Sequence, residues 1–249
     1  SEMCIRDSAN GPRFIGARRA DRSLDQFYNH DDEKAKAKDR TYSEFTDAAV
    51  FTKLDVKEEG GNLILTANYK LGNLDKAQWT IHPDGMATLD YTYNFSGVVD
   101  LMGICFDYPE EQVLSKRWLG AGPYRVWQNR IHGTQYDIWE NDYNDPIPGE
   151  TFTYPEFKGY FGSVSWMSIR TKEGTISLTN ETPDSYIGVY QPRDGRDRLL
   201  YTLPGSGISV LNVIPPVRNK VNSTDLCGPS SQPKWVDGPQ TGRLVLRFE

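Results

Sequence analysis

The sequence lacks the features that several classes of protein require. It has only three cysteines in 249 residues, and no two of them form a C-x-x-C pair. An odd number without that spacing indicates neither a zinc site nor a disulfide scaffold. No apolar run approaches the roughly eighteen residues of a membrane-spanning helix, and the first residues lack the basic and apolar regions of a signal peptide. We therefore expect no membrane partner, and the compartment, periplasm or cytoplasm, stays open.

A basic surface and the nucleotide-binding motifs are also missing. The formal net charge is -6, and no basic stripe of the kind that binds nucleic acid is present. Neither G-x-G-x-x-G nor G-x-x-x-x-G-K-[ST] occurs. The glycine-rich stretch that ends at Pro123 lacks one N–H donor, because proline has none. We expect no nucleic-acid partner, no cofactor and no bound metal.

The usual catalytic signatures are absent as well. No G-x-S-x-G motif occurs, and His30, His82 and His132 stand singly in unrelated contexts, so a serine nucleophile is not indicated. Glycoside hydrolysis needs two carboxylates across one bond. Loop carboxylates are available, namely Glu140, Asp142, Asp145, Glu150 and Glu156. Nothing in the sequence distinguishes an acid from a base among them, so no catalytic residue is assigned and enzymatic activity of the chain stays open.

The dominant pattern from about Val50 onward has a period of two, which is typical of half-buried strands. In MATLDYTYNF, residues 86–95, aliphatic and aromatic side chains alternate with polar ones, and the turn HPDG before it predicts a hairpin with AQWTI. SVSWMSIRTKEGTISLTN predicts a second hairpin that turns at Lys172 to Gly174. Further strands are expected at 50–57, 62–70, 184–190, 207–214 and 243–249.

These strands predict one all-β domain with long loops, built as a sandwich. Only residues 21–38 could hold a helix, and they lack a helical period. Cys105 lies in the apolar run VVDLMGICF, where a buried free thiol is expected. WLGAGPYRVWQNR, residues 118–130, combines glycine, proline and tryptophan, and we interpret it as a tight loop between bulky anchors.

Aromatic residues and turn signals alternate between Trp118 and Phe161. Long ordered loops of this kind are usually functional. Aromatic rings among carboxylates, amides and guanidinium groups suit a sugar, whose C–H face stacks on a ring while its hydroxyls form hydrogen bonds. Trp118 and Trp166 lie in apolar runs and are interpreted as packing residues, whereas Trp127 and Trp139 in polar loops are candidates for sugar contact. His132 lies in the same region.

The segment WLGAGP resembles the W-x-G-x-G-P signature in the C-terminal domain of family 2 β-galactosidases. The neighbouring segments agree in order: AQWTIHPDGMATLDYTYNF and LMGICFDYPEEQVLSKRW precede the signature, and YPEFKGYFGSVSWMSI resembles the P-x-E-N-G-x-R segment that follows it. The similarity covers residues 10–249. It implies a β-supersandwich of the galactose-mutarotase-like type with long loops, while residues 1–9 match nothing in the family and are interpreted as a non-native or truncated start.

The resemblance also implies a function. In such enzymes the catalytic glutamates belong to a separate TIM barrel, so this chain would be a non-catalytic, carbohydrate-contacting domain. Its expected partners are a β-galactoside or related plant or algal glycan, and the N-terminal sandwich and TIM-barrel domains of the same enzyme. By position, Glu156 matches the glutamate of P-x-E-N-G, although Phe157 and Lys158 replace the Asn-Gly. The family's pocket-lining tryptophan lies in a late loop before the final strands, where Trp235 is the nearest candidate. The carbohydrate-binding candidates are Trp127, Arg130, His132, Trp139, Glu156, Tyr160 and Trp235.

Three alternatives remain at this stage. An aldose epimerase (mutarotase) on the same fold would need a histidine acid and a carboxylate base that face one sugar. A free-standing lectin-like module would bind sugar without turnover. A purely structural sandwich would expose an apolar patch where a neighbouring domain docks.

Overall fold

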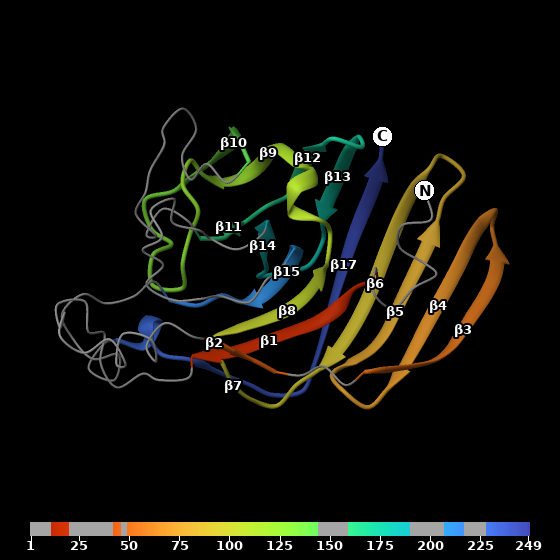
Figure 1. Ribbon diagram of the computed structural model, residues 1–249, viewed down its shortest axis with the longest axis horizontal. Coiled ribbons are helices and arrows are strands. Elements are labelled where there is room, and N and C mark those ends of the chain that lie inside the picture. Colours follow the sequence, from red (N-terminus) through yellow and green to blue (C-terminus); the bar gives the residue numbers. More distant parts are fainter. Residues whose placement is uncertain (1–10, 20–41, 46–48, 144–158, 190–206, 217–227) are drawn as a thin grey trace.

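The computed structural model describes residues 11–19, 42–45, 49–143, 159–189, 207–216 and 228–249. In these residues nearly all regular structure is β, and the named strands pair antiparallel in three sheets (Figure 1). The helical elements among them are two short 3-10 turns, η1 (Glu110–Gln112) and η4 (Pro229–Ser231). No helix of the described residues has the length and apolar character that crossing a membrane requires.

The largest sheet has nine strands in the order β10-β9-β12-β13-β17-β6-β5-β4-β3. Their bounds are β3 (Val50–Glu59), β4 (Asn62–Lys70), β5 (Leu74–Ile81), β6 (Met86–Asn94), β9 (Val113–Gly122), β10 (Gln135–Asp142), β12 (Trp166–Thr171), β13 (Thr175–Asn180) and β17 (Pro239–Phe248). Both sequence-predicted hairpins are present as β5–β6 and β12–β13.

A six-stranded sheet packs against part of this large sheet, in the order β11-β14-β15-β8-β1-β2. Its strands are β1 (Arg13–Arg19), β2 (Tyr42–Glu44), β8 (Leu101–Phe106), β11 (Phe161–Gly162), β14 (Tyr186–Val189) and β15 (Ile208–Val213). A third, two-stranded sheet joins β7 (Gly97–Val99) to β16 (Lys234–Val236). The expectation of an all-β sandwich is confirmed.

The main core lies between the two large sheets. In β6 the predicted alternation is observed, because Leu89, Tyr91 and Tyr93 are buried while Asp90 and Thr92 face outward on the other side. Tyr93 donates a 2.6 Å hydrogen bond to Asn212 Oδ1 across the core. A second, smaller apolar cluster covers the opposite face of the six-stranded sheet. This sheet is therefore covered on both faces.

The second cluster contains the free thiol predicted to be buried. Cys105 has no exposed surface and forms no disulfide. Burial, the largest cause, raises the pKa of its thiol well above the ordinary value, so the thiol is an inert packing group at neutral pH.

The interpretation of residues 118–122 as a loop is wrong. They form the last half of β9, which is paired with β10 on one side and β12 on the other. The glycines serve close approach and not a turn: a Cβ on Gly120 would lie 3.0 Å from Val164 Cα, and a Cβ on Gly122 would overlap the Trp139 ring. The loop begins only at Pro123, after a cis peptide bond.

Candidate functional site

The loop after β9, residues 123–134, is the part of the signature region that leaves the sheet. It first pairs with the chain before β11, since the amide of Val126 donates to Tyr160 O (2.7 Å) and the amide of Tyr160 donates back to Val126 O (2.9 Å). It then reverses tightly, because the amides of Trp127 and Arg130 each donate to the other's carbonyl oxygen. The loop is therefore a fixed structure with Gln128 and Asn129 at its turn.

This turn is bonded to a segment about a hundred residues later in the chain. The side-chain amide of Gln128 donates to Ser230 O (2.9 Å) and to Gln232 O (2.7 Å), and Asn129 Nδ2 donates to Ser231 Oγ (3.2 Å). The Gln128 backbone amide adds a bond to Pro215 O (3.0 Å). We call these contacts the Gln128 clamp. They fix the signature loop on the segment that leads into β16 and its central residue, Trp235.

Two of the sequence-predicted sugar contacts are packing residues instead. Trp127 is fully buried and Tyr160 is 1% exposed. Their rings meet edge to face at 5.7 Å between centroids, and they cover the outer face of the six-stranded sheet with Val126. Neither ring presents a face on which a sugar could stack, so the prediction for these two residues is corrected. Trp118, interpreted as packing, is indeed fully buried.

Trp139 occupies an intermediate position. Its ring is partly buried beside the main core, and its indole N–H donates to Gly120 O (3.2 Å) and Gln135 O (3.4 Å). One side of the ring rests against Gly122. Trp139 therefore helps to fix β10 on β9, and only the part of the ring that β9 leaves open is accessible.

The remaining candidates that the structure describes are all exposed. Arg130 and His132 are both exposed on the clamped loop. Trp235 is 71% exposed, although it belongs to a strand that pairs with β7 through Val98. An exposed tryptophan on an ordered strand is available for stacking. Glu156 lies outside the described residues.

Two buried cations beside this region had no clear signal in the sequence. Lys116 and Arg125 are 1% and 3% exposed, and both lie over the ring of Phe161, at 5.9 and 5.6 Å from its centroid. Lys116 Nζ also donates to Asp142 O (2.9 Å). Lysine and arginine are seldom buried without compensation. Only the alternation of β9, which turns Lys116 inward beside Trp118, could have indicated that burial.

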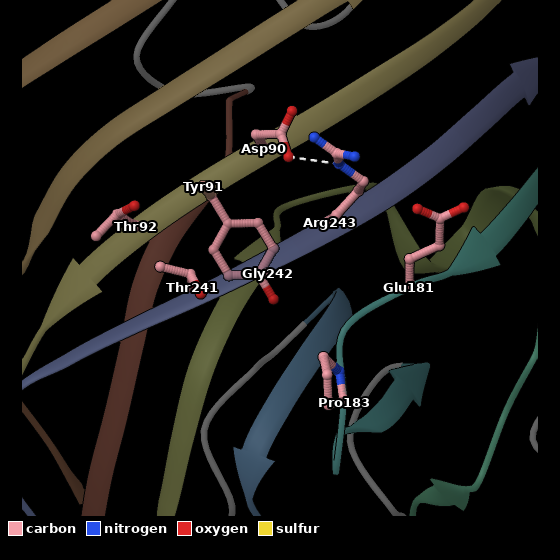
Figure 2. A pocket seen from close by; sticks show the side chains of 8 residues that line it. All are labelled: Asp90, Tyr91, Thr92, Glu181, Pro183, Thr241, Gly242 and Arg243. Carbon is pink, nitrogen blue, oxygen red and sulfur yellow. Dashed lines mark hydrogen bonds and ion pairs between the residues drawn. The ribbon is translucent and has the colours of Figure 1, made fainter.

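A second candidate site is an open groove of about 440 Å³ on the outer face of the nine-stranded sheet (Figure 2). It is lined by Asp90, Tyr91, Thr92, Glu181, Pro183, Thr241, Gly242 and Arg243. Asp90 and Arg243 are register partners in β6 and β17, and Arg243 Nε donates to Asp90 Oδ1 at 2.6 Å. That hydrogen bond is the main cause that raises the pKa of Arg243. The two residues are 153 positions apart in the chain, so no local sequence pattern indicates the pair.

The groove is polar, and hydrogen bonds join the two segments that line it. Figure 2 shows Arg243 between the carboxylates of Asp90 and Glu181. The loop after β13 is bonded to β17: the amide of Glu181 donates to Arg243 O (3.0 Å), and the amide of Arg243 donates to Thr182 Oγ1 (3.1 Å). Such a surface can hydrogen-bond a polar ligand. It offers no exposed aromatic face, since Tyr91 is 2% exposed.

Comparison with solved structures gives a likeness in fold alone. No protein-family model matches the chain, and no curated protein matches it in sequence. A solved structure of a GalM/aldose epimerase homologue from C. elegans matches over 80% of this chain and 69% of that chain, with 7% sequence identity and a TM-score of 0.32. At this identity and TM-score the likeness supports no statement about activity.

Proposed function

We propose that this chain is a carbohydrate-contacting domain of a family 2 β-galactosidase-like glycoside hydrolase, of the galactose-mutarotase-like type, and that it hydrolyses no glycoside alone. The observation that carries the proposal is the Gln128 clamp. It bonds the loop of the W-x-G-x-G-P signature to the segment that leads into Trp235. The resemblance expects a pocket-lining tryptophan in that late part of the chain.

The chemistry of the exposed residues supports sugar contact. Trp235 offers an apolar ring face, while Arg130 and His132 offer hydrogen-bond donors on a loop that is already ordered. An ordered loop loses little conformational freedom when a ligand binds. A complete pocket would need the barrel domain as well, so the isolated chain should bind a galactoside only weakly.

The test is ligand-observed saturation-transfer NMR with methyl β-galactoside and the 249-residue chain. We expect a transfer signal that Trp235→Ala removes and that Arg130→Ala or His132→Ala weakens. Phe51→Ala is the matched control, because Phe51 is an aromatic side chain with 50% exposure on β3. Arg243→Ala tests the groove: a signal that depends on Arg243 and not on Trp235 would move the sugar site there.

Activity assays separate the other functions. The isolated chain should release no nitrophenol from nitrophenyl β-galactoside, and hydrolysis abolished by changing one carboxylate would contradict the proposal. Polarimetry that shows accelerated mutarotation, lost in His132→Ala, would favour the aldose epimerase. In the described residues no hydrogen bond joins His132 to a carboxylate, so no contact there favours that reaction. Absence of any galactoside signal would leave only a structural role.

A further inference from the structure

The strand β3 is an edge of the nine-stranded sheet whose outer side pairs with no strand of the described residues. All ten of its residues are exposed, in contrast to the half-buried pattern of β5 and β6. In Figure 1 the β3–β4 hairpin extends to the right, away from β1 and β8 of the second sheet. An exposed edge of this length presents a row of backbone groups to which another strand can add.

The turn of the hairpin shows which backbone groups face that edge. Gly60 and Gly61 both have positive φ, 59° and 83°, as in a two-residue hairpin turn. In such a turn the flanking pair, here Glu59 and Asn62, exchanges both backbone hydrogen bonds. The register is regular from Lys53 to Glu59, so odd-numbered residues point their N–H and C=O groups toward β4. The even-numbered residues 54, 56 and 58 point theirs toward the open edge.

Charges alternate in sign along one face of this strand. Lys53 and Asp55 form an ion pair of 2.5 Å, and Lys57 and Glu59 form another of 2.7 Å. Their side chains are 49 to 69% exposed. Pairs this exposed stabilise a protein little, so these charges can exchange partners at small cost.

We propose that β3 pairs antiparallel with β3 of a second copy of this chain, about a two-fold axis at Val56. In this register Val56 faces Val56, Asp55 faces Lys57 and Lys53 faces Glu59, and each charged pair occurs twice by symmetry. The residues whose backbone groups point to the open edge also face one another. The interface is isologous, which is the commonest arrangement in homo-oligomers.

Neighbouring registers are disfavoured by the same charges. A shift of the axis to residue 55 places Asp55 opposite Asp55 and Lys53 opposite Lys57. A shift to residue 57 places Lys57 opposite Lys57 and Asp55 opposite Glu59. Like charges directly opposite one another destabilise a strand pair. The charge sequence of β3 therefore selects the axis at Val56 among these three registers.

The other face of β3 supplies apolar contact. Leu54 and Val56 are 40% and 58% exposed, and Leu63 on β4 is 37% exposed. Pairing at Val56 joins this apolar face to its copy and covers the two valines with each other. Leu54 then faces Glu58, whose carboxylate reaches solvent beyond the strand. The pairing removes from water both exposed apolar surface and unpaired backbone groups.

The first experiment measures association of the whole chain by sedimentation equilibrium. We expect a monomer–dimer equilibrium with a dissociation constant of about 10 to 200 µM, because an interface of one strand from each copy is small and such interfaces are weak. Lys57→Glu places a new carboxylate opposite Asp55 twice, and Asp55→Lys places a new ammonium group opposite Lys57 twice. Each should raise the dissociation constant about tenfold or more. The double variant Asp55→Lys/Lys57→Glu restores complementarity and should return the constant to within about threefold of the original.

The second experiment tests the strand and its register. Val56→Pro removes an N–H that points to the open edge, so it should abolish the dimer and leave the thermal midpoint nearly unchanged. Under mild oxidation Val56→Cys should form a disulfide-linked dimer, because opposed residues of a hydrogen-bonded pair lie about 5.5 Å apart between Cα atoms. Leu54→Cys is the matched control and should cross-link no more than the unaltered chain.

Three results would overturn the proposal. One is a chain that stays monomeric at every concentration. In that case only a strand of a different protein could pair with this edge. Another is a dimer that Val56→Pro leaves intact while circular dichroism shows the native fold. The third is cross-linking through Leu54→Cys in place of Val56→Cys, which would place the axis elsewhere.

Discussion

The indole ring of Trp139 on β10 lies against the Cα of Gly122 on β9, so closely that a Cβ at Gly122 would overlap the ring. The same indole donates its N–H to Gly120 O at 3.2 Å. Gly122 thus leaves space for the Trp139 ring, and Gly120 accepts its hydrogen bond. The glycine spacing in WLGAGP is explained by packing across β9 and needs no phosphate or other ligand.

Gly122→Ala should therefore destabilise the chain by about 1 to 3 kcal/mol, because the new methyl group must displace the ring or the strand. Thermal unfolding followed by circular dichroism measures the change. Gly228→Ala is the control: a Cβ there meets nothing within 4 Å. An equal loss in both variants would show that the contact with Trp139 is not the cause.

Substitution of Trp127 should lower the stability of the fold, whereas substitution of Trp235 should leave it nearly unchanged. Trp127 is fully buried where the signature loop packs on the six-stranded sheet, so Trp127→Ala should cost about 3 to 5 kcal/mol of unfolding free energy. Trp235→Ala, at a residue 71% exposed, should change it by no more than about 0.5 kcal/mol. Chemical denaturation of both variants checks this. A neutral Trp127→Ala would refute the packing role assigned to that ring.

The Gln128 clamp can be tested by reversing one hydrogen-bonding group. Gln128→Glu replaces the donor amide with an acceptor that faces two carbonyl oxygens, at the present distances of 2.9 and 2.7 Å. We expect a loss of about 1 to 3 kcal/mol and faster amide hydrogen exchange in residues 228–232. Gln128→Ala should lose less, because water can reach the freed carbonyls. Unchanged exchange in both variants would mean that other contacts hold the segment.

Alkaline pH should destabilise the fold through its buried tyrosines. Burial, the largest cause, raises the pKa of Tyr91 from 10.0 to about 12 and raises that of Tyr93 further. The folded chain keeps protons that the unfolded chain releases, so stability is full below pH 10 and falls as the pH rises toward 12. Urea denaturation over this range measures the decline. Tyr91→Phe should make the decline shallower. An unchanged slope would contradict the contribution assigned to the ionisation of Tyr91.

Local patterns carried the information for the strands. The alternation in β6 and the turn residues of the β5–β6 and β12–β13 hairpins predicted these elements, because the inward-facing residues of a strand repeat every second position. The interpretation of residues 118–122 in the W-x-G-x-G-P segment as a loop is wrong, because they are paired strand. Glycine in a strand and glycine in a turn look alike in a sequence, and only the neighbours in space distinguish them.

The sequence by itself determined the all-β class, the positions of strands with a clear alternation such as β6 and β12, and the burial of Cys105, since these depend on periodicity and on short-range turns. Only the tertiary structure decided that Trp127 and Tyr160 pack on the six-stranded sheet while Trp235 stays exposed. Likewise it decided that Gln128 bonds to residues about a hundred positions away, and that Asp90 meets Arg243. Whether an aromatic or charged side chain is buried depends on which distant strand lies over it, and no local pattern encodes that.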